Sequence, residues 1–300
     1  MVVHPEPEIR AFLKARRAAL DPAELGLPEG LTRRRVRGLR REEVARLAGI
    51  SVDYYTRIEQ GRAHAISEPV LSAIERALRL TSAEARYLRN VAGPRRQSHP
   101  RPVQRVRPEI RHLLDAMDAT VPAFIQGRGL DVLAWNRLAA RIGFDYDAIE
   151  PERRNAALLV FLHPSARALH PDWELIAESM VGNLRAEAGR SPEDPRLRCV
   201  IGELLDSSAD FRRLWEAQSV QERCSGTKRV LHPQVGELVL CYESFRLPQE
   251  AGQTLCTYTA PRDSPTSRKL RELAGEGGGE GEGGGEGEGE RDRTPVAGRA

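Results

Sequence analysis

The sequence predicts two folded domains in series, an all-α domain of five helices followed by an α+β domain, and then a disordered tail. Apolar residues recur at helical spacing through the first 93 positions, whereas residues 108–274 mix helical segments with short alternating strands. Residues 275–290 contain only glycine and glutamate. A chain of 300 residues fits this division, since a typical domain has roughly 100 to 200 residues.

The segment LRREEVARLAGISVDYYTRIEQGR, from Leu39 to Arg62, predicts two short helices joined by a tight turn. The first has an apolar face made of Val44, Ala45, Leu47 and Ala48. Small Ala45 lets the second helix cross closely, and Gly49 stands where the turn needs a positive φ.

The second helix opens at Ser51, a good N-cap residue, continues through Gln60 and closes at Gly61. Tyr55 and Ile58 share a face with Ile50 and should point to the core, so their neighbours point outward. The outward residues that suit base edges in a DNA major groove are Val52, Asp53, Thr56 and Arg57. Those better placed to bond phosphates are Arg41, Ser51, Tyr54, Gln60 and Arg62. The pattern predicts a helix-turn-helix that binds duplex DNA.

Three further helices frame this motif. The first carries Ile9, Phe12, Leu13 and Leu20. The fourth opens near Ser67 with Pro69 in its first turn, and the fifth has a capping box of Thr81 and Glu84 before it stops at Gly93 and Pro94. The alternative interpretation of the motif is an ordinary αα-hairpin with a charged surface.

Residues 1–93 resemble the lambda-repressor-like domain of the XRE family of transcriptional regulators, most closely through SVDYYTRIEQGR (Ser51 to Arg62). The resemblance implies a five-helix bundle that docks the helix beginning at Ser51 into the major groove of an operator. It also implies a homodimer on two half-sites one helical turn apart.

Residues 94–107 read as a Pro/Arg-rich linker, and residues 275–300 as the disordered Gly/Glu-rich tail. Arginines crowd the first hundred positions, as expected for a DNA-binding half. No apolar run is long enough to cross a bilayer and no secretory signal is present, which predicts a cytoplasmic, nucleoid-associated protein without membrane contact. Cys199, Cys224, Cys241 and Cys256 form no metal-binding pattern, so we expect free thiols and no metal or cofactor.

Within residues 108–274 the pattern predicts helices and strands in alternation. The expected helices are 110–117, 155–162, 172–187, 196–206 and 209–217, and the expected strands are 122–126, 131–135, 228–231, 237–245 and 253–259. A sheet wrapped by helices results.

This second segment resembles the MmyB-like ligand-binding domain that follows XRE-type domains in many bacterial regulators. The resemblance is carried by DVLAWNRLA (131–139), RRN (153–155), VFLHP (160–164), DWE (172–174), NLRAEAGRSPEDPRL (183–197), SADFRRLWEAQSV (208–220), GTKRVLHPQVGELVLCYESF (226–245) and QTLCTYTAP (253–261). It implies a PAS-like fold, a small antiparallel sheet with helices over one face, around an apolar pocket for a fatty-acid-like ligand.

A pocket of this kind needs apolar walls with a few placed polar groups. The polar candidates are Asn136, Arg153, Asn155, Arg185, His232, Glu243 and Gln253, and the apolar walls are Trp135, Phe161, Trp173, Phe211 and Trp215. Each aromatic is also a candidate core residue, and Arg185 and Glu243 are also candidates for a structural ion pair. Leu231 precedes His232 where the family often has two histidines, which puts a histidine-pair role in doubt.

The combined interpretation is a sequence-specific DNA-binding regulator whose C-terminal domain senses a small apolar ligand. We expect no enzymatic activity and no catalytic residues, because the chain has no GxSxG, HExxH, Walker or GxGxxG motif. The alternative is a regulator whose C-terminal domain serves dimerisation or binds a protein partner.

Overall fold

The computed structural model describes residues 5–26, 38–63, 66–93, 104–117, 120–221, 224–249 and 252–275. The predicted linker lies outside these ranges except for residues 104–107, and so does the predicted tail from residue 276 onward. The division into domains at the predicted boundaries therefore stays a prediction.

The N-terminal part is all-α, as predicted. Its helices are α1 (Pro5–Ala19), α2 (Arg41–Ala48), α3 (Val52–Glu59), α4 (Glu68–Ala77) and α5 (Ser82–Ala92), with a short 3₁₀ turn at Ala23–Leu25. They enclose one apolar core built around Phe12, Leu13, Val44, Tyr55 and Ile58.

Two details of the predicted helices differ in the structure. Helix α1 ends at Ala19, so Leu20 lies just beyond it and is only partly buried. Leu47 was predicted on the apolar face of α2, which is wrong because 40 % of the residue is exposed. Apolar spacing alone does not separate Leu47 from its buried neighbours Val44 and Ala48.

The C-terminal part has helices and a five-stranded antiparallel sheet, which confirms the predicted α+β architecture. Its strands are β1 (Ala123–Gln126), β2 (Val132–Trp135), β3 (Ser225–His232), β4 (Gly236–Arg246) and β5 (Thr254–Thr259). Its helices are α6 (Pro108–Ala116), α7 (Arg137–Ile142), α8 (Ala156–Leu162), α9 (Ala166–Leu169), α10 (Trp173–Arg190), α11 (Pro195–Ser207), α12 (Ala209–Glu216) and α13 (Pro265–Ala274). Short 3₁₀ turns lie at Arg128–Leu130, Tyr146–Ala148 and Pro151–Arg153.

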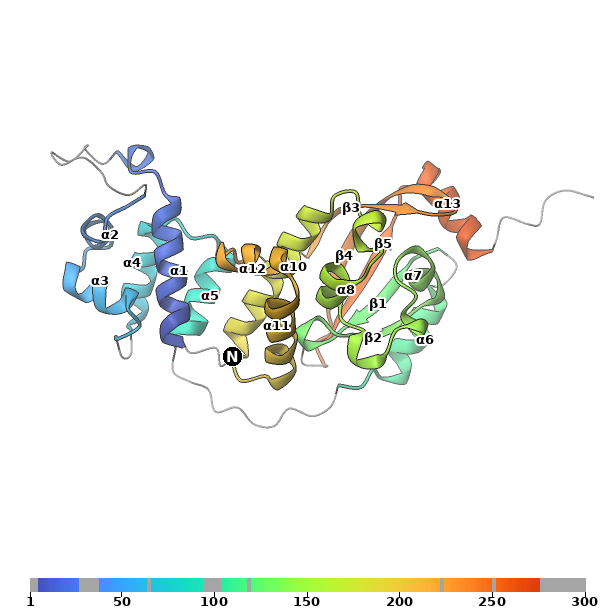
Figure 1. The fold of residues 1–300 in the computed structure, drawn as a ribbon, viewed down its shortest axis with the longest axis horizontal. Coiled ribbons are helices and arrows are strands. Elements are labelled where there is room, and N and C mark those ends of the chain that lie inside the picture. The colour runs from blue at the N-terminus through green and yellow to red at the C-terminus, as the bar shows by residue number, and fades with distance from the viewer. Residues whose placement is uncertain are drawn as a thin grey trace, which may run out of the picture.

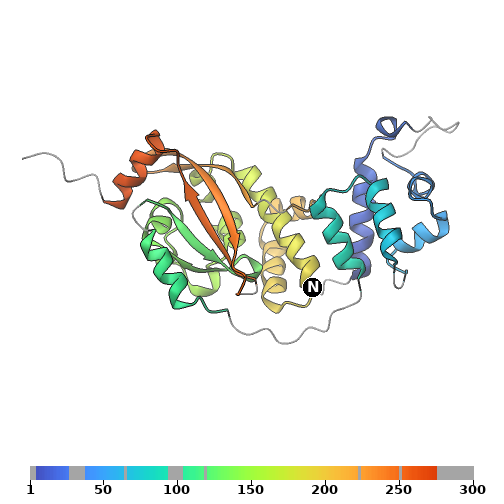
Figure 2. The same ribbon diagram turned by 180° about the vertical axis from the view of Figure 1, so that it is seen from behind.

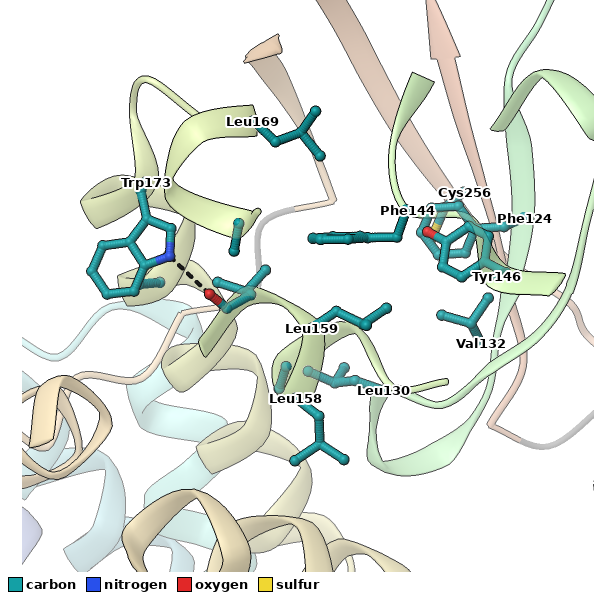
Figure 3. Close-up of a cluster of buried hydrophobic side chains, with 14 of the residues drawn as sticks. Phe124, Leu130, Val132, Phe144, Tyr146, Leu158, Leu159, Leu169, Trp173 and Cys256 are labelled. Atoms are coloured by element: carbon teal, nitrogen blue, oxygen red, sulfur yellow. Dashed lines mark hydrogen bonds between the residues drawn. The ribbon is translucent and has the colours of Figure 1, made fainter. Parts of the chain in front are cut away.

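The sheet has the strand order β2-β1-β5-β4-β3, and every neighbouring pair is antiparallel. One face carries Phe124, Val230, Leu238, Leu240 and Cys256 into the large core shared with the helices. Figure 3 shows part of this core, with the Trp173 indole donating a 2.8 Å hydrogen bond to the Val160 carbonyl.

The opposite face of the sheet is covered in part by α6. Leu114 of α6 packs there with Ala123, Ile125, Ala134 and Leu255. The resemblance implied helices over one face, so α6 is an addition to that expectation. Beyond α6, the same face of β3 and β4 exposes Leu231, Val239 and Phe245.

Helices α7, α9 and α13 were not predicted. Asn136 caps α7 by accepting from the Ala139 amide, and Ser264 caps α13 by accepting from the Ser267 amide, with Pro265 in its first turn. These are ordinary start signals, so α7 and α13 were recognisable from the sequence.

The helices α10, α11 and α12 lie between the N-terminal bundle and the sheet (Figures 1 and 2). Helix α10 packs against α5, and Ala186 and Val220 join the apolar core of the N-terminal helices. Gly189 lies so close to Tyr87 that a Cβ atom there would stand 2.6 Å from the ring. The two parts are therefore in direct contact through α10.

Candidate nucleic-acid interface and ligand site

The turn between α2 and α3 has the geometry that the sequence indicates. Gly49 ends α2 with φ 66°, and the Ile50 amide bonds the Ala45 carbonyl at 3.0 Å, which satisfies carbonyls at the end of the helix. Ser51 then caps α3, its hydroxyl accepting from the Tyr54 amide at 3.1 Å. Ala45 is buried at the crossing of the two helices.

The four residues predicted to read bases lie on the outward side of α3. Val52, Asp53 and Arg57 are exposed and Thr56 is half-buried, whereas Tyr55 and Ile58 on the opposite side are fully buried. The Arg57 guanidinium bonds no other residue in the described part of the chain. Helix α3 thus presents one short row of available polar and apolar side chains.

The residues predicted to bond phosphate surround this row. Ser51 and Arg62 are exposed at the two ends of α3, and Tyr54 and Gln60 are half-buried. Arg41 is about half exposed, but its Nε donates to Glu59 Oε2 at 2.6 Å. An anion approaching Arg41 therefore meets a guanidinium that already has a carboxylate partner.

Glu59 is a structural residue that the sequence analysis missed. It is buried at the end of α3, where Arg41 of α2 and Arg17 of α1 both bond its carboxylate. Arg17 also donates to the Leu39 carbonyl at 2.6 Å. Burial, and then the charge of Glu59, raises the pKa of the Tyr55 hydroxyl well above its usual range. Position i+4 from buried Tyr55 was the available signal, since it places Glu59 on the inner face.

In the C-terminal part the structure does not gather the twelve predicted ligand residues into one pocket. Asn136 and Asn155 are buried and bonded to the backbone. The Asn136 amide oxygen accepts from the amides of Ala123 and Ala139, both at 3.0 Å. The Asn155 side chain caps α8 and donates to Gly129 and Asp131. Both asparagines fix local backbone.

The predicted aromatic walls divide between two places. Phe161, Trp173, Phe211 and Trp215 stack edge-on or face-on within the helical core, with ring centroids 5.1 to 5.7 Å apart. Trp135 lies apart from them, at the end of β2. Phe161, Trp173, Phe211 and Trp215 therefore have the surroundings of core residues, which was the alternative to a ligand wall.

Four polar candidates are dispersed over the surface and the sheet. Arg153 is exposed and pairs with Glu203, and Glu243 is exposed on β4. His232 is buried at the end of β3, where its Nε2 bonds the Arg141 carbonyl at 2.9 Å. Gln253 is buried and donates to the Arg105 carbonyl at 3.0 Å.

Arg185 lies at the contact between the two parts of the chain. Its fully buried guanidinium stands 3.9 Å from the Trp215 ring and bonds the Gln218 side chain at 2.7 Å and the Trp215 carbonyl. It also bonds Glu8 of α1 at 3.2 Å, and the Tyr87 hydroxyl of α5 donates to the same Glu8 oxygen at 2.8 Å. Arg185 therefore joins α10 to two helices of the N-terminal bundle.

A cleft of about 720 Å³ opens beside Trp135, the one predicted ligand residue that lines it. Its apolar lining is Leu133, Ala134, Trp135 and Ala140, and its charged lining is Arg111, Arg137, Arg141, Arg154, Asp145 and Asp147. The four arginines come from α6, α7 and the segment before α8, so distant parts of the sequence form this cleft. We call it the arginine cleft.

The arginines of this cleft are held in different ways. Arg154 lies over the Trp135 ring at 5.1 Å and donates to the carbonyls of Tyr146 and Ile149, both at 2.8 Å. The Arg111 side chain, exposed on α6, has no bonding partner among the described residues. Four guanidinium groups against two carboxylates favour an anionic occupant, and the aromatic wall suits an apolar portion.

Comparison with protein families assigns both parts of the chain. Residues 106–273, more than half of the chain, match the MmyB-like transcription regulator ligand binding domain. The chain belongs to the MmyB-like transcription regulators. Residues 8–88 match a helix-turn-helix domain, so this MmyB-like regulator pairs a DNA-binding domain with a ligand-binding domain. No curated protein matches the chain.

The described residues offer neither a membrane span nor a metal site. No helix among them is both long and apolar enough to cross a membrane. In the same ranges no group of three His, Cys, Asp or Glu side chains is arranged to hold a metal ion. The four cysteines are unpaired, and only Cys256 is buried.

Proposed function

We propose that this regulator reads a specific operator through α3 and that the arginine cleft binds a small ligand with an anionic group and an apolar portion, such as a fatty acid. The observation that carries the first half is the outward row of Val52, Asp53, Thr56 and Arg57 on a helix whose other face is buried. Because the protein would bind DNA, we expect it to act in the cytoplasm, at the nucleoid.

The chemistry of the row suits the major groove. Arg57 can bond the two acceptors of a guanine, Asp53 can accept from a cytosine amine, and the Val52 methyls can contact a thymine methyl. Ser51, Tyr54, Gln60, Arg62 and Arg41 would fix the register on the phosphates.

The short length of α3 supports binding as a homodimer. Its 8 residues span roughly 12 Å at 1.5 Å per residue. This covers only three or four base pairs at about 3.4 Å each, too few to define an operator. Two copies on half-sites about 10 base pairs apart would double the sequence that is read.

Selection of duplexes from a random library by the full chain tests the DNA half of the proposal. We expect an inverted repeat with half-sites about one helical turn apart. Enrichment of no sequence above the starting library would contradict it.

The ligand half rests on the lining of the arginine cleft. A carboxylate would pair with its guanidinium groups, while Trp135, Leu133 and Ala140 would contact an alkyl chain. Native mass spectrometry of the purified chain, followed by solvent extraction, tests this directly. A copurifying carboxylic acid lost in Arg154→Ala would support the proposal, and an uncharged molecule retained by that variant would contradict it.

Hydrogen bonds, joined by short stretches of backbone, link the cleft to helix α1 of the N-terminal bundle. Next to Arg154, Asn155 donates to the Gly129 carbonyl at 2.7 Å, and the Gly129 amide donates to Glu187 of α10 at 3.1 Å. Two residues earlier on α10, Arg185 bonds Glu8 of α1. We propose that an occupied cleft favours one position of α10 and so one placement of the N-terminal bundle.

A second candidate function is supported by the exposed face of β3 and β4. Leu231, Val239 and Phe245 are each between 43 and 53 % exposed, which suits a partner protein or a second copy. A regulator whose C-terminal domain serves only association would copurify as an empty dimer. Its DNA affinity would then be unchanged by any small acid, which separates the two candidates. Neither candidate involves catalysis.

A further inference from the structure

The carboxyl end of α13 lies at the rim of the arginine cleft. Arg137 donates to the Ala274 carbonyl at 3.3 Å and Arg141 donates to the Leu273 carbonyl, and both arginines line the cleft. Helix α13 packs on α7, beside which it ends in Figure 1. Gly275 then closes the helix with φ 92°. The chain beyond residue 275 therefore starts next to the guanidinium groups of Arg137 and Arg141, two of the four that line the cleft.

The sequence that follows is opposite in charge to the cleft. Residues 276–290 contain six glutamates, no lysine, no arginine and otherwise only glycine. The cleft presents four arginines and two aspartates. The first three glutamates are Glu276, Glu280 and Glu282, within seven residues of Gly275.

We propose that the acidic segment 276–290 occupies the arginine cleft of its own chain. Its reach is sufficient, since a glycine-rich chain of seven residues spans on average about 13–16 Å and at most about 25 Å. Because Arg137 and Arg141 both bond carbonyls in the last turn of α13, that span starts at the rim of the cleft. Each of the first five glutamates has a glycine on both sides, and glycine permits many backbone conformations, so the sequence does not fix which carboxylate pairs with which guanidinium group.

The covalent connection of the acidic segment to α13 determines whether weak ion pairs can hold the segment in the cleft. An exposed carboxylate–guanidinium pair contributes only about 0.2–1 kcal/mol, so a free peptide of this composition would bind poorly. A short flexible connection raises the effective concentration to the millimolar range, which lets two or three such pairs hold the segment for much of the time. Added salt screens exposed pairs and should release it.

This occupant has a consequence for the proposed ligand, and this consequence alone rests on the proposed function. A carboxylate ligand and the acidic segment would use the same guanidinium groups, so each would displace the other. The apparent ligand affinity would fall in proportion to the fraction of clefts left open.

Backbone amide NMR of the full chain tests the proposal, because glycine amides resonate apart from most others. We expect the glycine signals of residues 276–290 to differ at low salt from those of a synthetic peptide of that sequence. In 0.5 M NaCl, in Arg111→Glu, and in the combined variant E276Q, E280Q and E282Q, they should return to the peptide positions. Arg10→Glu makes the same charge change on α1 and should leave the low-salt positions intact. Signals equal to those of the peptide at low salt would overturn the proposal, as would an equal response to Arg10→Glu. Shifts that grow with protein concentration would overturn it too, since they indicate the cleft of another copy.

Decanoate binding, measured by calorimetry on the full chain and on a chain ending at Gly275, separates this inference from the ligand proposal. If the acidic segment occupies the cleft of the full chain, the shortened chain should bind decanoate about three to ten times more tightly than the full chain does. Equal affinities in the two chains would count against the acidic segment as the occupant. Failure of both chains to bind decanoate contradicts the ligand proposal, and the NMR result then still decides the position of the segment.

Discussion

At the scale of single residues, the position of α3 depends on a buried carboxylate, that of Glu59. Glu59 is buried and bonds Arg17 and Arg41, so it fixes the end of α3 to α1 and α2. The sequence showed the outward residues of α3 because their spacing is local. Glu59 was missed because its partners lie 42 and 18 positions away.

Replacing Glu59 should destabilise the fold without altering the outward row. We expect Glu59→Gln to lower the free energy of unfolding by about 1–3 kcal/mol, less than for a fully buried pair because both arginines keep contact with water. Urea denaturation measures this. Glu42→Gln, on an exposed pair with Arg40, is the matched control and should change stability by less than about 0.5 kcal/mol.

Loss of the Arg57 side chain should reduce the specificity of the protein for its DNA sequence. Because its guanidinium is exposed and without a partner in the described chain, Arg57→Ala should weaken binding to the selected duplex by about 1–3 kcal/mol. Titration of selected and scrambled duplexes at one salt concentration checks this. An equal loss on both duplexes would identify Arg57 as a phosphate contact instead.

His170 should make the stability depend on pH. Burial, and then the charge of Lys228, lowers the pKa of its imidazole to about 3. The unfolded chain has the ordinary pKa near 6.5, so between these values it binds the proton that the folded chain excludes. Stability is therefore fully present above about pH 6.5 and falls as the pH decreases, by up to about 1.4 kcal/mol per pH unit. Denaturation between pH 5 and 7 should show a smaller slope for His170→Gln. The same slope as in the wild type would assign the effect to another group, and His112→Gln, on an exposed histidine, should leave it unchanged.

At the scale of elements, capping residues explain most of what the sequence predicted. Ser51 and Thr81 each accept from amides in the first turn of their helix, as their positions indicated, and Asn155, predicted as a ligand residue, does the same for α8. Helices α7 and α13 have the same signals and were overlooked. The arginine cleft had no such signal, since it forms only when α6, α7, β2 and the turn before α8 come together.

Helix α10 is the element that joins the two parts, and its Gly189 lies against the Tyr87 ring of α5. A Cβ atom at Gly189 would lie 2.6 Å from the Tyr87 ring, whereas one at Gly202 of α11 would meet nothing within 4 Å. We expect Gly189→Ala to separate α10 from α5 and to lower the melting temperature. Gly202→Ala should stabilise by up to about 1 kcal/mol through helix propensity. Hydrogen exchange of α5 and α10 amides measures the separation, and equal protection in both variants would contradict it.

At the scale of the whole molecule, helix α10 joins a DNA-binding bundle to a ligand-binding domain, and the buried Arg185 is one of its contacts. Arg185 was predicted as a ligand residue from its family motif, but its neighbours are Glu8, Gln218 and Trp215. No local pattern reveals a pairing 177 positions apart. The sequence therefore predicted the fold class of both parts and the presence of helix α3, but not the contact between the two parts.

The most direct test of that control is the affinity of the full chain for its selected duplex, measured at one salt concentration while the copurified molecule, or decanoate in its place, is titrated. Coupling of about 1–3 kcal/mol between the cleft and α3 predicts a change in the dissociation constant of at least about fivefold. The change should be reduced in Gly189→Ala and retained in Gly202→Ala. An affinity that stays constant across the titration would contradict the account, because the C-terminal domain would then bind its ligand without any effect on DNA reading.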